Sequence, residues 1–306
     1  MIERLEAPAD ARAWCAQQRA AGKTIGFVPT MGALHAGHLS LVQQALQEND
    51  VVCVSVFVNP LQFDESADLI AYPRDWDGDV ALLQACGCQM VFTGTLAQFF
   101  PDELDGQGKF PASALKDPGP GALGLEGSTR DGHFEGVATI VERLFEVVQP
   151  TRAYFGQKDF QQTLVARYLV RAGDTPRVVI CPISREESGL ARSSRNERLS
   201  AEERAGAVFL SQALARCAQA WQAGERRAAQ LEAILQSSIL NSGRAFDYAA
   251  VRNPAAWSVE MPEGELAEAV AVVAARVGPV RLLDNHLLAD PFPQPPVGAC
   301  SQAKQS

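Results

Sequence analysis

The stretch "IGFVPTMGALHAGHLSLVQQALQENDVVCVSVFV", Ile25–Val58, decides the fold that this sequence predicts. It begins and ends with short β-branched runs, "IGFV" (Ile25–Val28) and "VVCVSVFV" (Val51–Val58), which are typical of buried strands. Between them, "HLSLVQQALQ" places its apolar residues along one stripe of a helix. Strand, helix and strand within about thirty residues form a βαβ unit, which predicts a parallel strand pair with a right-handed crossover.

The same alternation continues along the chain. Helix-like "DVALLQACG", "VATIVERLFEVVQP" and "FQQTLVARYLVRAG" alternate with strand-like "MVFTG", "AYFG" and "RVVICPI". This order predicts a doubly wound parallel α/β sheet of the Rossmann-like kind. The segment Pro101–Arg130 is rich in glycine and proline, and we expect it to be a loop or flap.

The texture of the sequence changes after "ARSSRNERLS". Ser200 and Glu203 form a capping box that opens a predicted helix over Ala201–Ala223, and "ERRAAQLEAILQSSI" predicts a second helix. Two strand-like runs, "AVAVVAARV" and "VRLLDNHLL", follow. We therefore expect three regions: a Rossmann-like domain over 1–183, a smaller α+β domain over 184–288, and a disordered tail over 289–306.

Composition limits the partners. The 306 residues carry a net charge of −9 and have no Lys/Arg block, which argues against binding to nucleic acid. No apolar run is long enough to span a bilayer, and the N-terminus lacks the features of a signal peptide, so no membrane partner is expected. The seven cysteines are odd in number and scattered, which is typical of free thiols in a reducing cytoplasm.

The loop "PTMGALHAGH" is the first candidate site. It follows a strand and precedes a helix, at the sheet edge where open α/β sheets bind ligands, and a helix N-terminus attracts phosphate. Gly32 and Gly37 let the backbone come close to a ligand, and His35 and His38 are three residues apart on the helix start. Zinc binding is disfavoured because no glutamate follows the first histidine and no third ligand is evident. Spacing alone leaves phosphate handling and a structural turn equally open.

Three further polar clusters favour the ligand interpretation. Each has an ordinary explanation, since Asn-Pro marks turns, lysines are often exposed, and Ser-Ser-Arg-Asn is a common capped loop. A lysine at a helix start is electrostatically unfavourable, however, and a bound anion would explain it. The clusters follow separate strands or the domain junction: Asn59 and Gln62 in "FVNPLQF", Lys158, Asp159 and Gln162 in "FGQKDFQQ", and Ser193, Ser194 and Arg195 in "ARSSRN".

Taken in order, the motifs resemble one family. They are "PTMGALHAGH", "FVNPLQF", "YPR" (Tyr72–Arg74), "LEGSTRDGHFEGVATIV", "FGQKDFQQ" and "GLARSSRN", and they run from about Ile25 to Asn196. This set is similar to that of the pantoate–β-alanine ligases, also called pantothenate synthetases. The resemblance implies ATP-dependent condensation of (R)-pantoate with β-alanine to pantothenate, AMP and pyrophosphate, through pantoyl adenylate. It also implies a cytoplasmic homodimer and Mg²⁺ accompanying ATP.

The resemblance also implies roles for individual residues. His38 would donate a proton near the departing pyrophosphate, His35 would assist, Lys158 would bridge phosphate oxygens, and Arg195 belongs to a loop that closes over phosphates. Gln62 and Gln162 would hold pantoate, and Gln62 would also lie near the path of β-alanine. Asn59 would support them from behind, and Asp79 is a candidate magnesium ligand. The implied ATP site comprises Met31, Gly32, Ala33, Leu34, His35, Ala36, Gly37, His38, Gly156, Gln157, Lys158, Asp159, Ser184, Arg192, Ser193, Ser194 and Arg195.

Some questions stay open at this level. Arg192 stands where the family usually has Met or Leu, and a cation there would either disturb adenine packing or add a phosphate contact. His133, in "RDGHFEG", is interpreted as a loop histidine that satisfies backbone groups. Two rival functions are nucleotidylyl transfer to another acid and nucleotide binding without catalysis.

Overall fold

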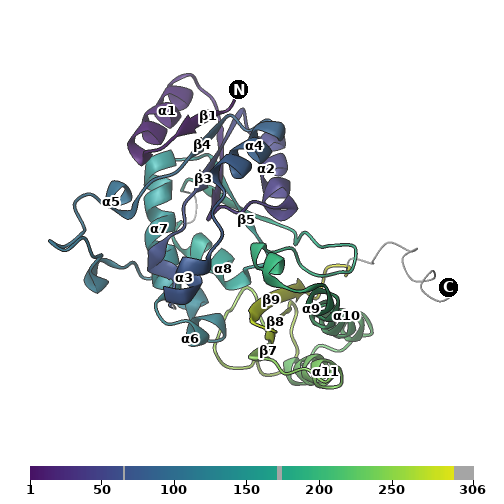
Figure 1. The fold of residues 1–306 in the computed structure, drawn as a ribbon. Coiled ribbons are helices and arrows are strands. Elements are labelled where there is room, and N and C mark those ends of the chain that lie inside the picture. Colours follow the sequence, from purple (N-terminus) through teal and green to yellow (C-terminus); the bar gives the residue numbers. More distant parts are fainter. Residues whose placement is uncertain (65, 171–173, 293–306) are drawn as a thin grey trace. The chain divides into compact units, whose positions relative to one another are not determined.

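A computed structural model describes residues 1–64, 66–170 and 174–292 (Figure 1). The chain divides into two compact units, Met1–Pro182 and a second that begins at Ile183. The first holds a parallel sheet flanked by helices, and the second holds a small antiparallel sheet with helices. The predicted fold class, a doubly wound sheet with a smaller α+β part, is confirmed.

The sheet of the first unit has the order β1-β4-β3-β2-β5-β6, and every described pairing in it is parallel. From β2 the chain adds β3 and β4 on one side and later returns to add β5 and β6 on the other. The switch point therefore lies between β2 and β5, where such sheets bind ligands. The strands are β1 (Glu3–Leu5), β2 (Ile25–Thr30), β3 (Val51–Val56), β4 (Met90–Phe92), β5 (Arg152–Gly156) and β6 (Arg177–Cys181).

Alternation along the strands explains why helices cover both faces of this sheet. Ile25 and Phe27 of β2 pack in one core with α1, α7 and α8, whereas Val28 packs in a second core with α2 and α4. The helices are α1 (Pro8–Ala20), α2 (Ala36–Glu48), α3 (Ser66–Ala71), α4 (Trp76–Ala85), α5 (Leu96–Phe99), α6 (Glu126–Thr129), α7 (His133–Val148) and α8 (Phe160–Tyr168).

The segment expected to be a loop or flap, 101–130, consists of loop and short helical turns. These are the 3₁₀ turns η2 (Ala112–Ala114) and η3 (Pro120–Ala122), followed by α6. Buried Gln161 of α8 anchors its second half, because its Nε2 donates to Gly121 O at 3.1 Å and its Oε1 accepts from Glu126 N at 2.9 Å. This part of the segment is therefore tied to the sheet domain by side-chain hydrogen bonds.

In the second unit, two helices pack on one face of an antiparallel sheet. Val251, Val273 and Leu282 of the sheet share a core with Leu214 and Leu231 of the helices. The sheet order is β7-β8-β9, formed by β7 (Tyr248–Arg252), β8 (Val270–Val277) and β9 (Val280–Leu287). The helices are α9 (Ala201–Gly206), α10 (Phe209–Gln222) and α11 (Ala228–Leu240), and the 3₁₀ turn η4 (Ser194–Arg198) precedes them.

The structure corrects three details of the second unit. The single helix predicted over Ala201–Ala223 is two helices, and the first ends at Gly206, the poorest helix former in that run. Strand β7 was not predicted, because "YAAVR" is short and alanine-rich. Phe292 packs edge-on against His286 with ring centroids 4.7 Å apart, so the predicted tail does not begin at 289. The rest of that tail, 293–306, lies outside the described residues.

Candidate active site

The loop between β2 and α2 is held in an unusual backbone shape. Gly32 has φ 84° and Ala33 has φ 50°, both in the left-handed region. The carboxylate of Asp79, from α4, accepts hydrogen bonds from Ala33 N at 3.0 Å and Leu34 N at 2.7 Å. Asp79 is only 2% exposed, and burial raises the pKa of its carboxyl group. Asp79 thus braces the loop from beneath.

This bracing role differs from the magnesium-ligand role that the sequence indicated for Asp79. Both carboxylate oxygens already accept backbone hydrogen bonds. Within the described ranges, no group of three or more His, Cys, Asp or Glu side chains is placed to hold a metal ion. The described side chains form no dedicated metal cage, and the candidate role of Asp79 as a magnesium ligand stays a prediction.

His35 and His38 cap helix α2 reciprocally. His35 Nδ1 accepts from Gly37 N at 3.1 Å, and His38 Nδ1 accepts from His35 N at 3.3 Å. The two rings lie 4.1 Å apart between centroids. Because each Nδ1 is an acceptor, each neutral imidazole carries its proton on Nε2. No acidic side chain occupies the first turn of α2, so the positive end of the helix dipole is not neutralised there.

The second part of the site follows β5, the neighbour of β2 in the sheet. Lys158 Nζ pairs with Asp159 Oδ1 at 3.3 Å, just before α8. Burial, and next the adjacent His35, lower the pKa of His38 to about 3; Asp159 opposes this shift and Lys158 adds to it. The charges of Asp159 and Lys158 therefore both act on His38, and its imidazole is neutral at pH 7. The two loops follow neighbouring parallel strands and therefore lie at the same edge of the sheet, as predicted.

The third part is the turn after β3, formed by Asn59 and the 3₁₀ turn η1 (Pro60–Gln62). Asn59 is 1% exposed, and its Oδ1 accepts from Leu61 N at 3.2 Å. Its Nδ2 donates to Gln62 Oε1 at 3.1 Å, and Gln62 Nε2 donates to Met31 Sδ at 3.0 Å. Gln62 is thereby joined to the loop after β2. Gln162, the other predicted pantoate residue, lies half-buried in the first turn of α8.

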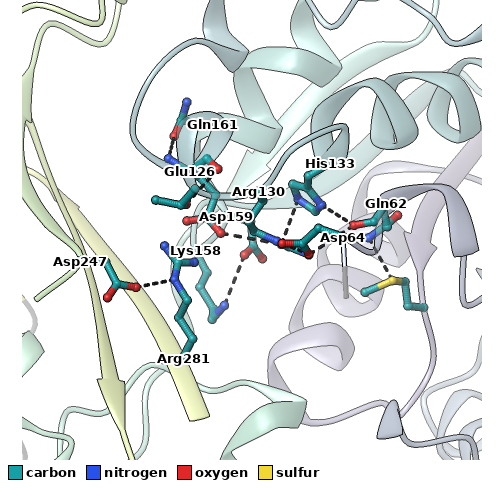
Figure 2. Close-up of polar contacts among 12 residues, drawn as sticks. Gln62, Asp64, Glu126, Arg130, His133, Lys158, Asp159, Gln161, Asp247 and Arg281 are labelled. Carbon is teal, nitrogen blue, oxygen red and sulfur yellow. Dashed lines mark hydrogen bonds and ion pairs between the residues drawn. The ribbon is translucent and has the colours of Figure 1, made fainter. Parts of the chain in front are cut away.

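Behind Gln62 lies a charged cluster that sequence reasoning did not identify (Figure 2). His133 Nδ1 is 2.8 Å from Gln62 O, and Arg130 Nη2 donates to the same oxygen at 3.3 Å. Arg130 also pairs with Asp64 at 3.6 Å and Glu126 at 3.7 Å. The sequence signal was the motif "RDGHFEG", whose histidine was interpreted as satisfying backbone groups. It does so, but the group it satisfies belongs to Gln62.

The predicted residues from Ser184 onward belong to the second unit. Ser193 caps η4 by accepting from Arg195 N at 3.3 Å. Ser184 O accepts from Arg192 N at 2.9 Å, which closes the short turn between them. The Arg192 side chain donates from Nε to Arg185 O at 3.2 Å, so part of its guanidinium serves the local backbone. The role of these residues in binding ATP stays a prediction.

Fold and site together define a class: a doubly wound α/β protein whose imidazole, ammonium and amide donors gather at the carboxyl ends of parallel strands. Residues 3–287 match the family model described as Pantoate-beta-alanine ligase. The chain belongs to this family, and the predicted resemblance is confirmed. No helix in the described parts is both long and apolar enough to cross a membrane.

Individual relatives agree. The pantothenate synthetase of Gluconobacter oxydans (strain 621H) is 47% identical over 266 residues, which cover 86% of this chain and 92% of the relative. A crystal structure of pantothenate synthetase from Thermus thermophilus is 40% identical with a TM-score of 0.82, covering 94% of this chain and 99% of that one. A Francisella tularensis pantoate-β-alanine ligase, crystallised with β-γ ATP and β-alanine, is 28% identical with a TM-score of 0.70, covering 96% and 100%.

Proposed function

We propose that this chain condenses (R)-pantoate with β-alanine at the expense of ATP, giving pantothenate, AMP and pyrophosphate through pantoyl adenylate. The observation that carries the proposal is that the loops holding His35, His38 and Lys158 follow the neighbouring parallel strands β2 and β5, and that Gln62, after β3, donates to Met31 in the first of these loops. Family membership supports the identity of the two substrates.

The first step joins two anions. The pantoate carboxylate attacks the α-phosphorus of ATP, the bond from that phosphorus to the bridging oxygen breaks, and pyrophosphate leaves. Catalysis therefore requires compensation of charge and alignment of the reacting groups. We propose that Lys158 supplies the positive charge, while the Nε2–H groups of His35 and His38 and the start of α2 donate hydrogen bonds to phosphate oxygens.

The state of His38 refines the predicted proton-donor role. Because burial lowers the pKa of His38 to about 3 in the folded protein without ligand, the imidazole is neutral before ATP binds and acts as a hydrogen-bond donor. An incoming polyanion favours the protonated form and raises this pKa. We propose that His38 can then hand a proton to the departing pyrophosphate, with His35 assisting.

In the second step the β-alanine amine attacks the carbonyl carbon of the adenylate, the carbon–oxygen bond to AMP breaks, and the amine loses a proton. A free carboxylate cannot react in this way because its leaving group would be oxide. We propose that Gln62 and Gln162 hold pantoate, that Gln62 also lines the path of β-alanine, and that Asn59 supports Gln62 from behind.

We further propose that residues 1–183 form the ATP- and pantoate-binding domain, with Met31–His38 and Gly156–Asp159 on ATP. Ser184 and Arg192–Arg195 would add contacts to the nucleotide, the arginines to its phosphates. Mg²⁺ would arrive bound to ATP phosphates, as is usual for an ion that keeps several of its waters. We also propose a homodimer in the cytoplasm, which light scattering after size exclusion would test as a mass twice 32.9 kDa.

The decisive measurement is AMP release with pantoate and β-alanine supplied separately and together. We expect AMP only with both, and pyrophosphate–ATP exchange with pantoate alone. Exchange with another carboxylic acid and not with pantoate would favour a different nucleotidylyl transferase. ATP binding without exchange or AMP release would favour the non-catalytic alternative.

A further inference from the structure

We infer that His133 and Arg130 are positioning residues that hold the Asn59–Gln62 turn in the shape in which Gln62 contacts substrate. This inference rests on the proposed role of Gln62 in binding pantoate. Neither His133 nor Arg130 takes part in the reaction steps proposed for the enzyme. Three features support the inference: the hydrogen-bond directions, the charges around Arg130, and the packing of α7 on the turn.

The hydrogen bonds to the turn have fixed directions. A carbonyl oxygen only accepts, so His133 Nδ1, which is 2.8 Å from Gln62 O, must carry a proton. Its Nε2 is then an acceptor and lies 3.2 Å from Arg130 Nη1, which donates. Arg130 Nη2 donates to the same Gln62 oxygen. The three groups form a closed triangle with one compatible tautomer of the histidine.

The charge of Arg130 is compensated within the cluster. A guanidinium near a buried imidazole is costly unless it is paired, and Asp64 and Glu126 pair with it. The Arg130 side chain is 16% exposed and that of Glu126 is 7% exposed, so the pairing is shielded from solvent. Burial, and next Arg130, lower the pKa of His133 to about 4, which agrees with a neutral imidazole that accepts from the guanidinium. The imidazole thus stays in one protonation state at neutral pH.

Helix α7 packs directly on the turn. A Cβ on Gly136, in the first turn of α7, would lie 2.7 Å from Gln62 N and closer still to Leu61 O. Asn59 Nδ2 also donates to Gly136 O at 3.1 Å. The Gln62 backbone is fixed by α7 and its preceding loop, while the Gln62 side chain is fixed by Asn59 and Met31. A shift of the backbone would therefore move the amide that meets substrate (Figure 2).

The test compares His133→Ala, His133→Asn and Gln62→Ala in the complete protein, measuring KM for pantoate, KM for ATP and kcat. Without His133, the carbonyl oxygen of Gln62 loses one of its two hydrogen-bond donors and the turn is held less firmly. We therefore expect His133→Ala to raise KM for pantoate about tenfold. KM for ATP should change little. Asparagine can place an amide donor near the position of Nδ1, so His133→Asn should recover most of the lost pantoate affinity.

His286→Ala is the matched control. His286 is also a buried histidine that contacts a backbone carbonyl, Asp290 O at 3.0 Å, but it lies in the second unit and outside the proposed site. We expect it to lower the melting temperature and to leave KM for pantoate unchanged.

The outcomes separate the two levels of proposal. If Gln62→Ala raises KM for pantoate and His133→Ala does not, the positioning role is wrong and the pantoate role of Gln62 stands. If Gln62→Ala itself leaves that KM unchanged, the proposed role of Gln62 fails and the inference fails with it. Equal effects of His133→Ala and His133→Asn, or a similar effect of His286→Ala, would reduce His133 to a general packing residue and overturn the inference.

Discussion

At the scale of single residues, the histidines and the lysine of the candidate site make different electrostatic contributions. His35 and His38 use their Nδ1 atoms as helix caps, which leaves Nε2–H as the donor on each ring. Both are uncharged donors in that state, and the pKa of His38, about 3, excludes a charged ring at neutral pH before ligand binds. Among the residues of the first unit that are proposed to contact phosphate, the permanent positive charge therefore comes from Lys158.

The first prediction follows from that difference. Lys158→Ala removes the charge that offsets the growing negative charge on the phosphates, and we expect adenylate formation to slow by a hundredfold or more, about 3 kcal/mol. Single-turnover measurement of pyrophosphate release with ATP and pantoate reports this step directly. Lys23→Ala is the control, because Lys23 is exposed, lies outside the proposed site and donates to Gln18 Oε1 at 3.0 Å. A near-normal single-turnover rate in Lys158→Ala would exclude Lys158 from the chemistry.

At the scale of elements, the loops were harder to predict than the strands and helices they connect. The parallel sheet follows from local periodicity, since runs such as Val51–Val56 and helices such as Ala36–Glu48 carry their own patterns. The braces do not. Asp79 reaches Leu34 across 45 positions, and His133 reaches Gln62 across 71. A pattern within one element holds no information about such partners, so neither the hydrogen bonds from Asp79 to the loop nor the identity of the backbone group that His133 contacts was predicted.

The second prediction tests the brace beneath the loop after β2. Gly32 and Gly22 both have positive φ, 84° and 76°, but only Gly32 is crowded, since a Cβ there would lie 2.9 Å from Asp79 Oδ2 and from Val56 Cγ1. Gly22→Ala should cost about 1 kcal/mol of unfolding free energy from backbone strain alone. Gly32→Ala should cost about 2–4 kcal/mol, because displacement of buried groups is added.

Urea unfolding of both variants measures the difference, and KM for ATP shows its effect on the loop. We expect Gly32→Ala to weaken ATP binding and Gly22→Ala to leave it unchanged. Equal unfolding free energies for the two variants would show that the contact with Asp79 does not restrain the loop.

At the scale of the whole molecule, the chain has a strongly negative net charge, −9, and yet a substrate with a polyphosphate tail is proposed. The proposal needs cations that are concentrated locally, because the negative net charge of the chain repels phosphates. In the first unit few groups are proposed to do this. Sequence predicted that gathering because strand order alone brings the loops after β2, β3 and β5 to one edge. Sequence did not predict that the pKa values of His38 and His133, two of the four histidines, are strongly lowered in that unit.

The last prediction links His133 to stability against acid. Its pKa is about 4 in the folded chain and ordinarily 6.5, as expected when unfolded, so between these values the unfolded chain binds a proton that the folded chain does not. The histidine's contribution is therefore fully present above pH 6.5 and is lost as pH falls toward 4, by about 3 kcal/mol at most. Carboxyl groups also titrate in this range, so the comparison must be with His133→Asn, which removes this titration and keeps an amide donor near the position of Nδ1. Urea unfolding from about pH 4.5 to 7 should show a smaller loss of stability for the variant; parallel curves would mean that His133 titrates normally in the folded protein.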